Sequence, residues 1–161
     1  MKVILVRHAK AMDRLKALLK TIADEERPLT KKGVKKFNSH LDVHIREFAS
    51  TELFICSELL RAKQTLELIL QKRPSKKPVT PLYLQKIGPE DSPVMLLKWL
   101  QARTEKKIVI VGHEPFISKF ISKANGAVIK EKIKKGAIIC TEINFSDDGQ
   151  AQIIIEKILQ P

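Results

Sequence analysis

Arginine and histidine side chains follow three short apolar runs of this sequence, and their types fit the chemistry of one kind of group. Arg7 and His8 follow the first run, Arg61 comes shortly after the second, and His113 follows the third behind Gly112. Guanidinium groups offer paired donors that match the oxygens of a phosphoryl group. A neutral imidazole is a competent nucleophile toward phosphorus, and its phosphorylated form can then be hydrolysed. These residues therefore predict a pocket that binds a phosphoryl group.

The predicted pocket needs neither a metal ion nor a cofactor. Flanking arginines lower the pKa of a histidine and hold its ring neutral. Fixed cations and the free N–H groups of helix N-termini stabilise the charge on a transferring phosphoryl group. Arg7 and Arg61 are not expected to pair with carboxylates, because no acidic cluster lies near them in the sequence. Ser57 and Gly112, at the ends of the second and third runs, are predicted to help bind the phosphoryl group.

The three apolar runs, residues 3–6, 53–56 and 108–111, have the composition of buried central strands. Between and around them, apolar residues recur at steps of three and four, which predicts helices. Strands alternating with helices indicate an α/β fold, a three-layer sandwich with a mainly parallel central sheet and helices on both faces. Ligands collect at the carboxyl ends of such strands, so the three runs deliver their arginines and histidines to one edge of the sheet. The predicted helices cover residues 15–22, 34–48, 59–70, 94–100 and 116–121.

Local signals mark the ends of several elements. Thr30, Ser57 and Ser92 stand where each would cap the first turn of a predicted helix. The turn at residues 147–149 joins two strand-like stretches near the C-terminus and predicts a hairpin.

Length and composition limit the class of protein. The 161 residues predict one domain spanning 1–161, with 30 Lys and Arg against 18 Asp and Glu and a formal net charge of +12. This excess attracts anions such as phosphates, nucleic acid or acidic protein surfaces. Cys56 and Cys140 lie in apolar runs and predict buried thiols in a reducing compartment. Because the sequence has no apolar run of membrane-spanning length and no signal-peptide pattern, we expect a cytoplasmic protein without a membrane partner.

Several other features have two interpretations. The basic segments Lys72–Lys77 and Lys130–Lys135 are either solvated surface or a docking face for an acidic partner. Nucleic acid is the weaker candidate, because aromatic residues are not interleaved with the lysines. His40 and His44 have the spacing of metal ligands on a helix, but no third ligand stands out, so a solvated helix face is favoured. Cys56 is one residue too close to the next arginine for the spacing of cysteine phosphatases.

Four segments that together include the residues of the predicted pocket stand at positions 5–11, 27–33, 56–65 and 111–115. They resemble the motifs of the histidine phosphatase (phosphoglycerate-mutase-like) superfamily, and their order and spacing agree with it. The matches run from Val3 to about Phe120. The subgroup that the chain resembles most is that of the SixA-type phosphohistidine phosphatases, which are small and lack the inserted cap of larger members. Ala9 stands where the wider superfamily has glycine; small members commonly carry alanine there, so activity is expected to be kept.

The resemblance implies a role for each residue of the predicted pocket. His8 would carry the phosphoryl group transiently, Arg7 and Arg61 would hold its oxygens, and His113 would support it in the transition state. The implied enzyme is a metal-independent phosphatase that works through a phosphohistidine intermediate.

The leaving group and the substrate are less sharply defined. Larger relatives use a carboxylic acid to protonate the leaving group, and Glu90 and Asp91 lie in a corresponding loop as candidates. The absence of a clear acid favours a labile P–N bond, as in phosphohistidine, and the absence of a lid favours a phosphorylated protein as substrate. A broad phosphomonoesterase acting on small sugar or nucleotide phosphates is the alternative, and a non-catalytic basic binding module is the less favoured one.

Overall fold

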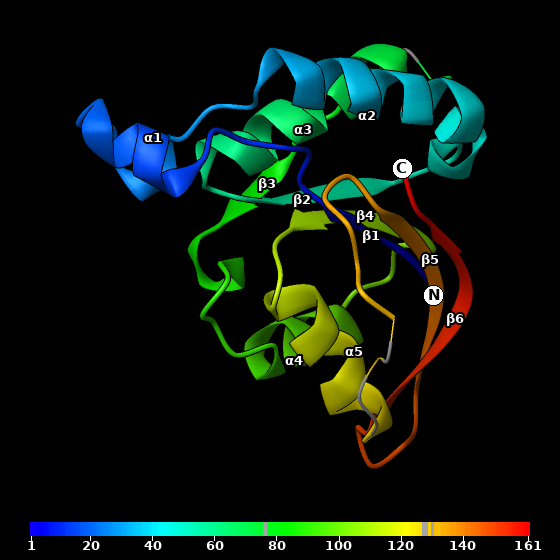
Figure 1. The fold of residues 1–161 in the computed structure, drawn as a ribbon. Helices are drawn as coiled ribbons and strands as arrows, with labels where there is room; N and C mark the ends of the chain where they lie inside the picture. Colours follow the sequence, from blue (N-terminus) through cyan, green and yellow to red (C-terminus); the bar gives the residue numbers. More distant parts are fainter. Residues whose placement is uncertain (76, 127–128, 130) are drawn as a thin grey trace.

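Within residues 1–75, 77–126, 129 and 131–161, which the computed structural model describes, the chain forms a six-stranded sheet covered by helices on both faces (Figure 1). The strands are β1 (Lys2–Arg7), β2 (Leu53–Ser57), β3 (Leu82–Leu84), β4 (Lys107–Gly112), β5 (Ile138–Phe145) and β6 (Ala151–Leu159). The α-helices are α1 (Arg14–Leu19), α2 (Lys31–His44), α3 (Leu60–Lys72), α4 (Val94–Gln101) and α5 (Phe116–Asn125). Short 3-10 helices are η1 (Asp24–Glu26), η2 (Ile45–Phe48) and η3 (Gln85–Ile87).

The sheet has the strand order β3-β2-β4-β1-β5-β6. Strands β3, β2, β4 and β1 pair in parallel, whereas β5 pairs antiparallel with both β1 and β6. The predicted three-layer fold with a mainly parallel sheet is therefore confirmed, and so is the hairpin at its C-terminal end. Strand β3 was not predicted, because it is only three residues long and directly follows a stretch interrupted by prolines.

The central strands are apolar throughout because both faces of the sheet are buried. Val3 and Leu5 of β1 pack on the side of α4 and α5, and Ile4 and Val6 pack on the side of α2 and α3 (Figure 1). Two separate apolar clusters, one on each face, thus hold the sheet between its helical layers.

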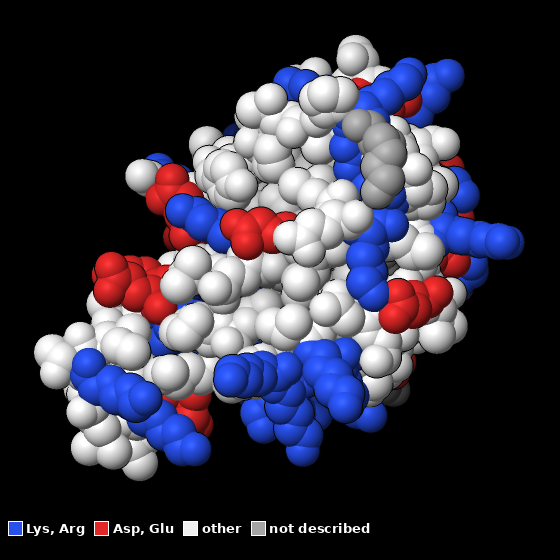
Figure 2. Space-filling model, turned by 90° about the horizontal axis from the view of Figure 1, so that it is seen from above, with Lys and Arg blue, Asp and Glu red and all other residues white. Residues whose placement is uncertain are grey.

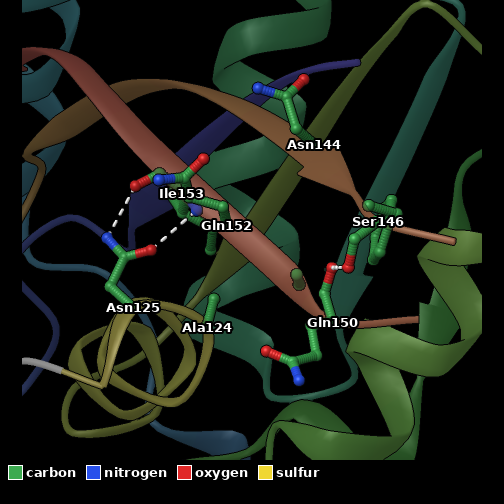
Figure 3. Close-up of a pocket in the computed structure, with 9 residues that line it drawn as sticks. Ala124, Asn125, Asn144, Ser146, Gln150, Gln152 and Ile153 are labelled. Atoms are coloured by element: carbon green, nitrogen blue, oxygen red, sulfur yellow. Dashed lines mark hydrogen bonds between the residues drawn. The ribbon is translucent and has the colours of Figure 1, made fainter. Parts of the chain in front are cut away.

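The terminal hairpin is fixed to helix α5 by one amide side chain. Asn125, the last residue of α5, donates from Nδ2 to the carbonyl of Ile153 at 2.6 Å and accepts from the N–H of Ile153 at 2.7 Å (Figure 3). Across the hairpin, the N–H of Ser146 donates to the carbonyl of Gln150 at 3.0 Å. Strand β6 is therefore held on its outer side as well as by β5.

The caps of the helices follow the predictions only in part. Thr30 caps α2 as predicted, since its Oγ1 accepts from the N–H of Gly33 at 2.9 Å. The prediction for Ser57 is wrong: Ser57 is the last residue of β2, and α3 begins after Leu59. Ser92 accepts from the N–H of Val94 at 3.5 Å, although the residue directly before α4 is a proline.

The structure shows the surroundings of the histidine pair on α2 and of the two cysteines. His40 is buried and bonds through Nε2 to the carbonyl of Leu159 at 3.1 Å, so the predicted solvated face is wrong for this residue. Its ring contacts that of His44, and no group of three or more metal-ligating side chains occurs among the described residues. Cys56 and Cys140 are buried free thiols, and burial raises the pKa of Cys140 to about 11.

The predictions about the basic segments and about the membrane can be compared with the structure only for the described residues. Lys76 and Lys130, members of the two basic segments, lie outside them. No helix among the residues that the structure describes is long and apolar enough to cross a membrane.

Candidate active site

The strand register brings the two predicted histidines together. Arg7 of β1 pairs with Gly112 of β4, so the next residue in each strand, His8 and His113, lies at the same edge of the sheet. The N–H of His8 donates to the carbonyl of Gly112 at 3.0 Å, and the centroids of the two imidazole rings are 5.0 Å apart. Both rings line an open cavity of about 630 Å³, together with Arg7 and Arg61. The four residues predicted to form the pocket thus share one cavity.

One ring nitrogen of His8 is held by the main chain, which sets its tautomer. Nδ1 lies 2.7 Å from the carbonyl oxygen of Ala9, and a carbonyl only accepts, so Nδ1 carries the proton. Nε2 therefore keeps its lone pair. Burial first, and then the neighbouring His113, Arg61 and Arg7, lower the pKa of His8 well below its ordinary value. The ring is neutral near pH 7, with one nucleophilic nitrogen.

His113 is a second neutral imidazole, more deeply buried than the first. It is 1% exposed, and neither of its ring nitrogens has a hydrogen-bond partner among the described residues. Burial, followed by the charge of Arg61, lowers its pKa to about 3. Burying a polar nitrogen without a hydrogen-bond partner costs free energy of folding. Both ring nitrogens of His113 are therefore candidates to form hydrogen bonds with a bound ligand.

The two arginines are each anchored at one end and free at another. Arg7 donates from Nη1 to the carbonyl of Ile133, and Arg61 donates from Nη1 to the carbonyl of Asp24 at 2.7 Å. The Nε atoms of both arginines are buried and have no partner in the described part of the chain. Anchored guanidinium groups with unused donors suit an oxyanion, because they need not reorganise to bind it.

Asp24 is a member of the site that the sequence did not reveal. Its Oδ2 accepts from Nη2 of Arg61 at 3.1 Å, and its Oδ1 lies 2.9 Å from Nε of Arg27 and 3.2 Å from Nε of Arg14. Partial burial raises the pKa of Asp24, but the bond to Arg27 and the three arginine charges outweigh it and lower the pKa. The expectation that Arg61 has no carboxylate partner is therefore wrong. Thirty-seven positions separate the two residues, and no local pattern connects them.

A hydroxyl group ties the segment that carries His8 to the helix that carries Arg61. The N–H of Ala9 donates to Oγ1 of Thr65 at 3.0 Å, and that hydroxyl donates to the carbonyl of Arg61 at 2.7 Å. On the other side of this segment, a Cβ added at Gly33 would lie 2.2 Å from the carbonyl oxygen of Lys10. Glycine at the start of α2 thus lets the helix pack against the segment after β1.

The remaining predicted site residues do not reach the cavity. Glu90 and Asp91 are absent from its lining, and the Asp91 carboxylate instead accepts from the N–H of Gly88 at 2.7 Å and closes its own loop. Ser57 is buried and accepts from the N–H of Leu59 at 3.4 Å, so its hydroxyl serves the turn before α3. Gly112 contributes only the carbonyl that holds His8. The structure therefore does not place these four residues where they would touch a bound group.

The two neutral histidines predict how stability depends on pH. Their folded-state pKa values lie below the ordinary value of 6.5, so the unfolded chain binds more protons as the pH falls below that value. Stability is then lost as the pH falls from 6.5 toward about 3 for His113, by about 1.4 kcal/mol per pH unit for each such histidine. Urea unfolding between about pH 5 and pH 7 should give a shallower slope for His113→Gln than for the unaltered protein. His44→Gln, a half-buried histidine outside the cavity, should keep the steeper slope. Equal slopes for all three proteins would contradict the neutral, buried state of His113.

Comparison with known proteins agrees with this geometry. The sequence model of the histidine phosphatase superfamily (branch 1) matches residues 3–82. A search of curated proteins found no match. Among solved structures, the protein histidine phosphatase SixA complexed with tungstate shares 21% identity, with a TM-score of 0.81 over 100% of this chain and 97% of that one.

Two further structures extend the comparison. A protein named as the phosphohistidine phosphatase SixA of Agrobacterium tumefaciens shares 17% identity, with a TM-score of 0.76 over 99% of this chain and 98% of that one. A mycobacterial glucosyl-3-phosphoglycerate phosphatase shares 9% identity, with a TM-score of 0.71 over 99% of this chain and 99% of that one. At these identities the structural similarity establishes the fold. The match to the family model identifies the superfamily. The chain belongs to the histidine phosphatase superfamily and is a phosphatase.

Proposed function

We propose that this chain hydrolyses phosphorylated substrates through a covalent phosphohistidine formed on His8, without a metal ion. The observation that carries the proposal is the bond between Nδ1 of His8 and the carbonyl of Ala9, 2.7 Å long, which leaves Nε2 as the nucleophilic atom. Around that atom, the cavity is lined by Arg7, Arg61 and His113, whose buried nitrogens include several without a partner among the described residues.

In the first step, the lone pair of Nε2 of His8 forms a bond to phosphorus as the bond from phosphorus to the leaving atom breaks. The leaving group takes the electron pair of that bond and a proton from water in the open cavity. Charge on the equatorial oxygens is stabilised by Arg7 and Arg61 and by an N–H of neutral His113. The ring of His8 gains positive charge, which the carbonyl of Ala9 stabilises through the Nδ1 proton.

In the second step, water attacks phosphorus and the bond to Nε2 breaks. The electron pair of that bond returns to the imidazole, inorganic phosphate leaves, and the proton lost by the attacking water passes to solvent. The proton on Nδ1 makes the ring a better leaving group than a neutral, unprotonated one, so the same carbonyl assists both steps.

A phosphoramidate, in particular phosphohistidine in a protein, is the substrate class that we favour. The candidate acids Glu90 and Asp91 do not line the cavity, and a P–N bond needs less help from an acid than an alkyl phosphate does. The similarity to the SixA structure supports the same class. The fold is shared with a glucosyl-3-phosphoglycerate phosphatase, so hydrolysis of small phosphate esters is the second candidate. We expect the reaction in the cytoplasm, where Cys56 and Cys140 remain thiols.

One panel of substrates tests this assignment. The protein is incubated with a histidine-phosphorylated protein, with free phosphohistidine and with sugar and nucleotide phosphates, each beside a variant that lacks His8. Hydrolysis of the phosphoramidates well above that of the esters supports the favoured class, and the reverse order supports the second candidate. The absence of hydrolysis with every substrate would exclude both.

Asp24 is expected to act on catalysis by positioning Arg61. Asp24→Asn removes the negative charge shared by three arginines while keeping the size of the side chain. We expect kcat to fall about 10-fold because Arg61 loses its fixed geometry. KM should stay the same or fall, because the cavity becomes more positive and attracts the anionic substrate more strongly. Steady-state kinetics on a single substrate separate the two constants.

Asp42→Asn provides the matched control for this prediction. Asp42 is an exposed carboxylate that pairs with Lys72 between α2 and α3, away from the cavity lining. Its variant should leave both constants unchanged. An unchanged kcat in Asp24→Asn would show that Arg61 is positioned without its carboxylate partner.

A further inference from the structure

Three leucines of helix α1 are exposed to an extent that is unusual for a folded chain. Leu15, Leu18 and Leu19 are 63%, 73% and 78% exposed, and we call them the α1 leucines. The helix is capped by Oδ1 of Asp13, which accepts from the N–H of Leu15 at 3.0 Å, and it packs on the body through buried Ala17. Clustered apolar side chains on a fixed helix mark an interaction surface, whereas single exposed ones need no explanation.

Helix α1 also forms part of the rim of the active-site cavity. Met12, Asp13, Arg14 and Lys16, which precede and begin the helix, line the cavity that holds His8. In Figure 1 the helix projects from the body beside α2 and α3, and its outer side is open. A molecule that reaches His8 and is large enough to extend past the rim would therefore meet the α1 leucines.

The charge around the cavity selects the kind of partner. Eight Lys and Arg residues line it against two carboxylates, those of Asp13 and Glu114. Seen from the side of α2 and α3, Figure 2 shows Lys and Arg side chains gathered along the lower edge of the molecule, next to the lobe at lower left. An acidic surface around the phosphorylated residue complements this rim, and like charges would oppose a second copy of this chain in the same place.

We propose that the α1 leucines and the basic rim together dock a folded, acidic phosphoprotein that presents its phosphorylated residue to His8. The proposal rests on the phosphatase function above and names the partner of the same site. The acidic surface is attracted by the rim, and an apolar patch beside the phosphorylated residue covers the leucines. A small phosphate compound in the cavity would leave the leucines exposed, so they distinguish protein substrates from small ones.

The test compares a protein substrate and a small substrate on the same enzyme variants. The first is a folded acidic domain with an exposed histidine, phosphorylated with potassium phosphoramidate, and the second is free phosphohistidine. Leu18→Glu and Leu19→Glu should each lower kcat/KM for the protein substrate by about 10-fold, mainly through KM, and leave free phosphohistidine unaffected. Raising the salt concentration should lower kcat/KM for the protein substrate more than for the small one.

Val43→Glu is the matched control for these variants. Val43 is 74% exposed on α2, one residue before that helix ends, and in Figure 1 this end of α2 lies far from α1. Its variant should behave like the unaltered protein with both substrates. Because the substitutions are on exposed side chains, circular dichroism should show that all three variants fold.

The outcomes separate docking from catalysis. If the unaltered enzyme hydrolyses both substrates and the leucine variants lose neither, the docking surface is refuted while the phosphatase function stands. If the leucine variants lose both substrates equally, α1 serves the cavity itself and docking is again refuted. Binding of the unaltered protein to anionic vesicles, lost in Leu18→Glu while the protein substrate is unaffected, would assign the leucines to a membrane surface instead. Failure of the unaltered enzyme on every substrate would refute the phosphatase function and the docking together.

Discussion

Replacing His8 by asparagine is expected to lower kcat/KM for every phosphorylated substrate by roughly 10⁴-fold or more, as loss of a nucleophile does in other covalent mechanisms. Asparagine can still donate a hydrogen bond toward the carbonyl of Ala9, in the position of Nδ1, but it offers no nucleophile in the position of Nε2. The variant should therefore fold and bind the substrate while failing to transfer the phosphoryl group. Initial rates and a substrate-binding measurement on the same preparation separate these effects.

His40→Asn is the matched control for the nucleophile. His40 is also a buried imidazole with a ring nitrogen near a carbonyl, that of Leu159, but it lies on α2 outside the cavity lining. Its replacement should cost stability and leave kcat/KM close to that of the unaltered protein. If His8→Asn kept more than about one hundredth of the activity, His8 would not be the nucleophile.

The second large effect is expected at Arg61, the largest fully buried side chain in the described part of the molecule. Arg61→Gln should lower kcat by about 10²- to 10³-fold, the usual effect of removing one fixed donor from a developing oxyanion. The side chain is 1% exposed and is held by Asp24, so its donors are already oriented before a substrate arrives. Arg61→Lys keeps the charge but not the paired donors, and it should restore only a small part of the rate.

Arg73→Gln separates catalysis from the cost of altering a buried arginine. Arg73 is buried at the end of α3, donates to the carbonyl of Lys77 and lies over the ring of Phe54. Its replacement should lower the urea midpoint without changing kcat. Equal losses of kcat in the Arg61 and Arg73 variants would mean that Arg61 acts through stability alone.

The site residues that were predicted from the sequence are those whose positions the sheet determines. Strands buried on both faces are apolar throughout, and parallel strands end at one edge, so the side chains after two such strands meet there. His8 and His113 follow this rule, and the pairing of Arg7 with Gly112 gives the reason. Arg61 follows because α3 begins just beyond the same edge of the sheet.

The part that could not be predicted depends on contacts between distant segments. Asp24 reaches Arg61 across 37 positions from a short 3-10 helix, for which no periodic pattern exists. The spacing of the leucines near residue 18 predicted helix α1 correctly, but spacing does not say whether an apolar face meets the body or solvent. Asp91 was a candidate acid by its position in a loop, and only the structure shows that its carboxylate is used by Gly88.

The most direct test of covalent catalysis by His8 is to trap the enzyme during turnover of a radiolabelled phosphoramidate. Rapid denaturation in alkali should recover a label that is stable to base and labile to acid, on the peptide that contains His8, and His8→Asn should carry none. Turnover without any trapped label, or a label on His113 or on Cys56, would contradict the mechanism. A label on His8 that forms and decays as fast as the overall reaction would establish it.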